Sequence, residues 1–124
     1  MMITAALVIS LHHRMIETSG GMHGVRDLSL LDSAIASIYQ TFDKKDLYPT
    51  LLQKICRLSY NLNTSHAFID GNKRISMHML ALMLRFNEFN YRPTNEEVID
   101  VGQQVANHQM DYEDLLEWVQ SKVK

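Results

Sequence analysis

Cysteine is almost absent from this sequence, and so is any segment typical of export or of a membrane. Cys56 is the only cysteine, so no internal disulfide can form, which fits a reducing compartment. We expect Cys56 to be a buried small apolar residue, because it follows Ile55 in a helical pattern. The apolar residues 1–11 lack a basic leading segment and a cleavage site, and they are too few to span a bilayer. We therefore expect a soluble cytoplasmic protein with no membrane partner.

The sequence also lacks an excess of one charge. The sequence has 12 Lys and Arg residues and 14 Asp and Glu residues, which gives a formal net charge of −2. Proteins that bind nucleic acids generally carry a basic surface. We therefore expect no direct nucleic-acid partner.

Known metal-binding motifs are missing, although the chain has six histidines. There is no His-Glu-x-x-His sequence, and neighbours such as His12 and His13 cannot easily face one metal ion from a helix. His23 and His78 could contact the substrate or support residues that do, and the sequence does not decide between these roles.

Strand signals are missing as well, because no segment alternates strictly between apolar and polar residues. Apolar residues recur instead at helical spacing, which predicts an all-α fold of about six helices in one domain, residues 1–124. The first helix should run to about Thr18 and stop at Gly20-Gly21. We expect residues 43–46 to form a loop, and a short hairpin is conceivable only near residues 20–28.

Five further helices are expected from their N-terminal signals. The second should be capped by Ser29, and the third should carry Pro49 in its first turn. The fourth follows Gly71 and is apolar around most of its girth, which is typical of a central buried helix. The last two open with polar pairs that are typical of helix caps, Thr94 with Glu97 and Asp111 with Asp114.

The segment His66–Arg74, called the motif segment below, carries the residues best suited to chemistry. It reads His-Ala-Phe-Ile-Asp-Gly-Asn-Lys-Arg and ends on the first turn of the expected fourth helix. A helix start offers unpaired N–H groups and partial positive charge, which suit a phosphate. Gly71 leaves room for a phosphate, Asn72 can donate a hydrogen bond, and Lys73 and Arg74 add positive charge.

The same segment contains a candidate base and a candidate metal ligand. Asp70 beside a phosphate is explained by an intervening Mg²⁺ ion, which takes a carboxylate together with phosphate oxygens and water. His66 can remove a proton from an attacking hydroxyl near neutral pH. Phe68 should anchor the loop in the core, and Ile69 could do the same. Each residue alone has an ordinary structural explanation, but the set together favours transfer of a phosphorus-containing group from a nucleotide.

This segment resembles the signature of the Fic/Doc family and is most similar to its Doc branch, the toxins of toxin–antitoxin pairs. The likeness extends over most of the chain, including residues 6–12, 20–21, 24–27, 30–34 and 111–118. It implies a Fic-type helical bundle in which His66 is the base and Asp70 holds Mg²⁺. It also implies that the phosphates of ATP lie on Gly71, Asn72, Lys73 and Arg74. Residues 20–27, called the flap below, would position the target, with Gly24 and Arg26 as candidate contacts.

The resemblance leaves open which group is transferred. Fic enzymes that move AMP have a glycine where this chain has Lys73. Doc toxins share the lysine, which implies a protein kinase that phosphorylates a threonine of elongation factor Tu and arrests translation. Gly71 instead matches the AMP-transferring enzymes, so AMP transfer is the alternative. The glycine-rich and catalytic-loop motifs of ordinary kinases are missing.

Regulation is expected to come from another protein. The self-inhibitory pattern of many Fic proteins, Ser or Thr, three residues, then Glu followed by Gly or Asn, is missing. An antitoxin acting in trans would then fold a segment into a groove near Arg74. A second alternative is that the chain only binds such a partner and catalyses nothing.

Overall fold

The computed structural model describes residues 3–123, and within that range the chain forms an all-α bundle. Six α-helices follow one another in this part of the chain, as the spacing of apolar residues predicted. They are α1 (Ala5–Ser19), α2 (Leu28–Ala36), α3 (Leu51–Thr64), α4 (Asn72–Phe86), α5 (Asn95–Ala106) and α6 (Tyr112–Lys122). A 3₁₀ turn, η1 (Ser37–Tyr39), extends α2.

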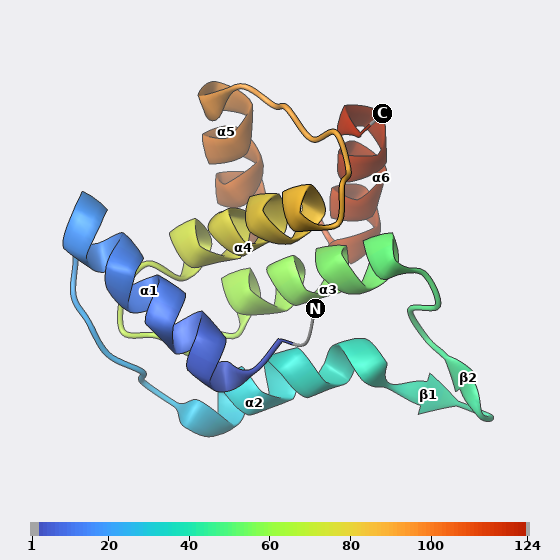
Figure 1. Ribbon diagram of the computed structural model, residues 1–124, viewed down its shortest axis with the longest axis horizontal. Helices are drawn as coiled ribbons and strands as arrows, with labels where there is room; N and C mark the ends of the chain where they lie inside the picture. Colours follow the sequence, from blue (N-terminus) through green and yellow to red (C-terminus); the bar gives the residue numbers. More distant parts are fainter. Residues whose placement is uncertain (1–2, 124) are drawn as a thin grey trace.

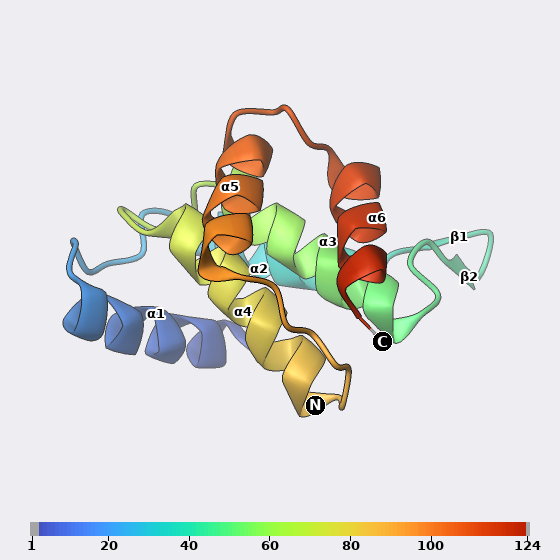
Figure 2. The ribbon, with the colours of Figure 1, turned by 90° about the horizontal axis from the view of Figure 1, so that it is seen from above.

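Helices α3 and α4 form the centre of the bundle and lie side by side (Figure 1). Helix α1 packs on α4, α2 packs on α3, and α5 and α6 rise across the central pair in both views (Figure 2). The expectation of a central buried fourth helix is confirmed, because Ile75, Met79 and Leu84 are fully buried. Cys56 is also fully buried in α3, as predicted.

The helix starts agree with the sequence at three places and differ at two. Helix α4 follows Gly71, and Thr94 and Asp111 each close a capping box at the start of α5 and α6. The cap of α2 is Asp27 rather than Ser29, because the Asp27 carboxylate accepts hydrogen bonds from two N–H groups of the first turn. The cap of α3 is Thr50, whose side chain pairs reciprocally with Gln53, so Pro49 precedes the helix.

The short hairpin lies elsewhere than the flap. Strands β1 (Thr41–Phe42) and β2 (Lys45–Asp46) pair antiparallel, so the stretch 43–46, where a loop was expected, holds the turn and β2. Asp43 and Lys44 join them with φ values of 53° and 63°, and two left-handed residues give a turn whose twist matches that of paired strands. The flap forms no hairpin of its own; Val25 makes an isolated antiparallel bridge to Phe68 of the motif segment.

Candidate functional site

The motif segment joins α3 to α4 and places its polar end at the start of α4. Gly71 is the N-cap residue and has left-handed backbone angles, φ 77° and ψ 19°. The first hydrogen bond of the helix runs from the Ile75 N–H to the Gly71 carbonyl, at 2.8 Å. The N–H groups of Asn72, Lys73 and Arg74 come before that bond, so they are available to an anion.

Gly71 is required by the local geometry. A left-handed φ is costly for a residue with a side chain. A Cβ atom at this position would also lie 3.0 Å from the Met15 Cε atom and 3.3 Å from an Arg74 nitrogen. The packing of α1 against the start of α4 therefore accounts for this glycine.

Phe68 and Asn72 hold the loop in shape. Phe68 is 1% exposed, which confirms the prediction that it anchors the loop, whereas Ile69 is 50% exposed and does not enter the core. The Asn72 side chain accepts from the Phe68 N–H and donates to the Phe68 carbonyl, both at 3.0 Å. Asn72 therefore braces the loop, and the hydrogen-bond donor it leaves for a phosphate is chiefly its backbone N–H.

Asp70 presents a partly exposed carboxylate at the same helix start. One oxygen accepts from the Gly71 N–H at 2.8 Å, and the other accepts from the Met22 N–H of the flap at 3.0 Å. The Met22 N–H, followed by the Gly71 N–H, lowers the pKa of the Asp70 carboxyl, so this group is anionic at neutral pH. Each oxygen keeps a lone pair, and one carboxylate with phosphate oxygens and water is a usual ligand set for Mg²⁺. The residues present therefore fit the ion that the sequence suggested.

His66 is exposed at the other end of the motif segment. Its φ of 55° is unusual for a residue with a side chain, and such strain is often found at functional sites. The Arg26 side chain donates to the His66 carbonyl at 2.7 Å and so holds the backbone in this conformation. Arg26 had been a candidate for contact with substrate; in the structure it positions His66.

Lys73 and Arg74 extend from the first turn of α4 in different directions. The Lys73 ammonium donates to the Gln103 side chain of α5 at 2.6 Å. The Arg74 guanidinium donates to the Ser19 hydroxyl and the Gly20 carbonyl, and it lies 3.7 Å from an Asp70 oxygen. These contacts use part of its five N–H donors and leave others for phosphate.

Both cations line a cavity of about 370 Å³ between α1, α4 and the start of α5. His78 and Arg85 of α4 contribute further nitrogen-bearing side chains. The rest of the wall is largely apolar and includes Met15, Met77, Ala81, Tyr91, Val98 and Ile99. A cavity with cations at one part and apolar side chains at another has the chemistry of a nucleotide site.

A larger cavity of about 580 Å³ lies between α5 and α6 and has the opposite charge. Glu97, Asp100, Asp114 and Glu117 all line it. Four carboxylates repel the phosphates of a nucleotide, so this cavity does not compete for that ligand.

The flap is tied to the motif segment by backbone hydrogen bonds. The Arg26 and Asp27 N–H groups both donate to the Ala67 carbonyl, at 2.7 and 3.1 Å. The Ile69 N–H donates to the Gly24 carbonyl at 3.0 Å. Gly24 faces the Ile69 side chain, where a Cβ atom would lie 2.8 Å from Cδ1. The flap therefore forms one unit with the motif segment, as a positioning role requires.

Two site residues were given no role from the sequence. His12 is 2% exposed, stacks on the Phe68 ring at 3.9 Å, and its Nε2 atom lies 2.7 Å from the Asp70 carbonyl. Its helical spacing with buried Val8 and Ile16 was the signal that could have found it. At Gly21, a Cβ atom would lie 2.6 Å from an Asp70 oxygen, and no sequence pattern reveals that approach.

His23 and His78, which had no assignment, lie in different places. His78 is exposed on α4 beside the cationic cavity. His23 is on the flap, and its Nε2 atom lies 2.9 Å from a carboxylate oxygen of Glu17 on α1. Across residues 3–123, no helix is long and apolar enough to cross a membrane.

Comparisons with known proteins show which sequences this chain is similar to. The Fic/DOC family model matches residues 2–84, a span that includes α1, the flap and the motif segment. A relative described as Toxin Doc, from Mycolicibacterium smegmatis, is 40% identical over 68 residues. The alignment covers 55% of this chain and 52% of that relative, so the chain spans about half the length of the relative.

Proposed function

The chain belongs to the Fic/DOC family, and from this premise we propose that it transfers the terminal phosphate of ATP to a serine or threonine hydroxyl of another protein. One observation carries the proposal. The start of α4 carries an anionic Asp70, free helix N–H groups and the cations Lys73 and Arg74, and both cations line a cavity of nucleotide character. His66 lies in the same loop, four residues before Asp70 and seven before Lys73.

In the proposed reaction, residues of this chain accept the proton and stabilise the negative charge. The His66 imidazole accepts the proton of the target hydroxyl. The hydroxyl oxygen forms a bond to the terminal phosphorus, while the bond from that phosphorus to the bridging oxygen breaks and ADP leaves. The N–H groups of α4 and the Arg74 guanidinium stabilise the charge on the transferred group. Asp70 would hold Mg²⁺, which neutralises phosphate charge when bound.

Lys73 and Gly71 bear on which group is transferred. A lysine at position 73 adds a charge and a side chain where an AMP-transferring enzyme would have glycine, which supports phosphate transfer. Gly71 pointed to the alternative, AMP transfer. Its left-handed φ and the Met15 Cε atom, which would lie 3.0 Å from a Cβ atom at this position, explain the glycine by local structure, so Gly71 gives AMP transfer less support than the sequence suggested.

We extend the proposal to the biological role. The name of the relative, Toxin Doc, supports a toxin. The resemblance of the motif segment to Doc toxins supplies the rest of the proposal, a translation protein as target, with elongation factor Tu expected. Its antitoxin would act in trans and place a segment in the cavity beside Arg74, where it would exclude the nucleotide. A cytoplasmic location follows from that target.

ATP labelled separately at the α and γ phosphates distinguishes the reactions. The purified chain, incubated with a bacterial lysate and Mg²⁺, should transfer the γ label to one protein band, which mass spectrometry then identifies. His66→Ala should abolish transfer, whereas His108→Asn should not, because His108 is exposed and outside the site. Transfer of the α label would establish AMP transfer instead.

Growth of cells that express each variant tests whether catalysis is the function. Wild-type chain should arrest growth, and co-expression of the antitoxin should relieve the arrest. His66→Ala should permit growth. Arrest that persists undiminished with His66→Ala would mean that the chain acts by binding a partner alone.

A further inference from the structure

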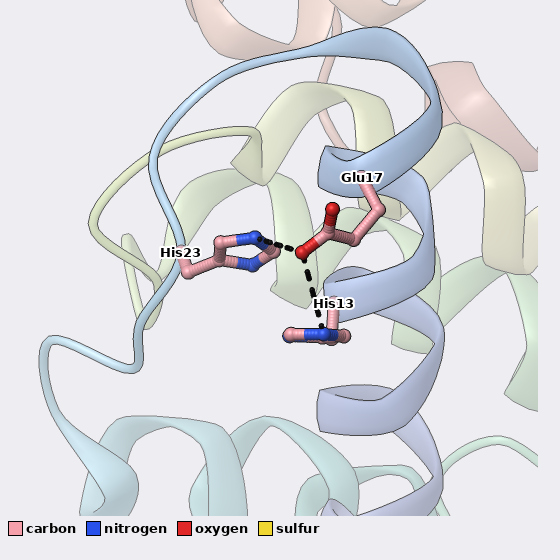
Figure 3. A group of neighbouring side chains, drawn as sticks. All are labelled: His13, Glu17 and His23. Atoms are coloured by element: carbon pink, nitrogen blue, oxygen red, sulfur yellow. Dashed lines mark hydrogen bonds and ion pairs between the residues drawn. The ribbon is translucent and has the colours of Figure 1, made fainter.

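A second group of potential ligands lies outside the proposed active site, where α1 meets the flap. His13, Glu17 and His23 each offer one ligand atom, and these atoms all lie within 4.8 Å of one another. Figure 3 shows both imidazoles directed at the Glu17 carboxylate, one from α1 and one from the flap. We propose that these three residues form a binding site for a divalent transition-metal ion of the Zn²⁺ type.

Helix α1 supplies two of the three ligands in a fixed relation. His13 and Glu17 are four residues apart, so they share one face of the helix. The His13 Nε2 atom lies 3.6 Å from the Glu17 Oε1 atom. Neighbouring ligands around a tetrahedral zinc ion lie about 3.3 Å apart, given bonds of about 2.0 to 2.2 Å. The helix pair is therefore within a few tenths of an ångström of a ligand pair.

The flap supplies the third ligand. The His23 Nε2 atom lies 2.9 Å from the same Glu17 oxygen, and the His13 and His23 rings stack at 4.3 Å. The pair of His23 and Glu17 atoms would have to open by about 0.4 Å to reach the ligand spacing of about 3.3 Å around zinc. Imidazole and carboxylate suit Zn²⁺ and its neighbours in the first transition row, whereas Mg²⁺ prefers oxygen ligands alone.

Solvent reaches this group, so an ion could enter and keep water ligands. All three side chains are exposed. A cavity of about 200 Å³ adjoins them, lined in part by His13, His23 and Gly24. Two histidines and one carboxylate leave at least one coordination position open, and water would fill it.

His12 shows why the adjacent histidines of α1 do not compete. It is buried against Phe68, with its Nε2 atom 2.7 Å from the Asp70 carbonyl, while His13 faces the flap. The sequence argument that His12 and His13 cannot share a metal ion therefore agrees with the structure. The partner of His13 is instead His23, ten residues along the chain.

An ion at this site would join the flap to α1. The flap already pairs with the motif segment through Gly24 and Val25. Fixing His23 to α1 would restrain the remaining residues of the flap, 20–23, whose Met22 N–H donates to Asp70. Metal binding should therefore slow hydrogen exchange in the flap.

Isothermal titration of the purified chain with Zn²⁺, in excess Mg²⁺, tests the proposal. One equivalent should bind. His13→Ala and His23→Ala should each weaken binding at least about tenfold, since even residues that only support a ligand commonly contribute that much. Glu17→Gln should weaken it similarly while keeping the shape of the side chain. His108→Asn is the matched control, because it removes an exposed histidine outside the group and should bind like wild type.

Hydrogen exchange of the flap distinguishes this three-residue site from a site formed by His13 and Glu17 of α1 alone. Zn²⁺ should slow exchange in the flap of the wild type and leave that of His23→Ala unchanged. Absence of Zn²⁺ binding to the wild type, or equal affinity of His23→Ala and His108→Asn, would overturn the proposal. Repeating the titration with His66→Ala keeps the result independent of the proposed transfer reaction, because that variant should bind Zn²⁺ as wild type does.

Discussion

The flap and the β1–β2 hairpin are both short irregular connections at the two ends of α2, but the structure uses them differently. The flap packs on the motif segment through hydrogen bonds to Ala67, Ile69 and Asp70. The hairpin projects from the opposite side of the molecule in both views, and all six residues from 41 to 46 are exposed (Figures 1 and 2). A salt bridge between Asp46 and Lys54 joins the hairpin to α3. Hydrogen bonds to the motif segment therefore distinguish the flap, whereas the strands of the hairpin pair only with each other.

Substitution of two neighbouring flap glycines should give the largest effect. Gly20 and Gly21 both have a positive φ, 89° and 120°, so alanine at either position should cost about 1–3 kcal/mol of stability. At Gly20 a Cβ atom meets nothing within 4 Å, whereas at Gly21 it lies 2.6 Å from Asp70 and 2.7 Å from Arg74. Those side-chain ends can move, so stability should fall similarly in both variants.

Activity should separate the two variants. Gly21→Ala displaces the carboxylate and the guanidinium, and a misplacement of about 1 Å can cost roughly 100-fold in rate. Gly20→Ala should stay within a few-fold of wild type. The measurements are urea unfolding and γ-phosphate transfer, and equal rates for the two variants would mean that the flap does not order the site.

The loop brace formed by Asn72 should give the next largest effect. Asn72→Ala removes two hydrogen bonds to the Phe68 backbone and should lower the free energy of unfolding by about 1–3 kcal/mol. Asn72→Asp keeps the acceptor for the Phe68 N–H and loses the donor, so its loss should be smaller. Urea denaturation of the three proteins measures this order. A stable Asn72→Ala would show that the flap holds the motif segment without this brace.

The flap carboxylate Asp27 should give a smaller, pH-dependent effect. The Ser29 hydroxyl, followed by the N–H groups of the first turn of α2, lowers the pKa of Asp27. A lowered folded pKa contributes stability above the ordinary value near 3.9, and this contribution is lost as the pH falls through the folded pKa. Asp27→Asn keeps a good helix cap but cannot titrate.

Thermal unfolding across acidic pH measures that contribution. The wild type should lose stability more steeply than Asp27→Asn below about pH 4, and the two should agree near neutral pH. Parallel curves down to strong acid would mean that the cap of α2 contributes no proton-linked stability.

The hairpin should give the smallest effect. Phe42 is 76% exposed, so Phe42→Ser should change the free energy of unfolding by no more than about 0.5 kcal/mol. Phosphate transfer should also be unchanged, because within residues 3–123 no backbone hydrogen bond joins the hairpin to the motif segment. A large loss of transfer in this variant would break the distinction between the two connections and indicate that the hairpin binds the protein target.

Local signals made much of the fold and part of the site predictable. The all-α class followed from helical spacing, and the caps at Thr94 and Asp111 followed from side chains that pair within one turn. The starts of α2 and α3 were misplaced because several neighbouring residues suit a helix start. Only the folded backbone selects Asp27 over Ser29 as the cap of α2, and Thr50, after Pro49, as the cap of α3. Ile69 was uncertain for a similar reason, since one apolar residue in a loop has no periodicity to orient it.

The sequence by itself determined the helices and the nine-residue motif segment, because both depend on residues close together in the chain. Tertiary structure alone decided which residues of the flap contact the motif segment and α1. It brought Arg26 to the His66 carbonyl, Gly21 to Asp70, and His23 to the α1 face that carries His13 and Glu17. These contacts join residues through the path of a loop, and a loop path follows no repeating pattern of side chains. Only folding of the flap across α1 and α4 could therefore reveal them.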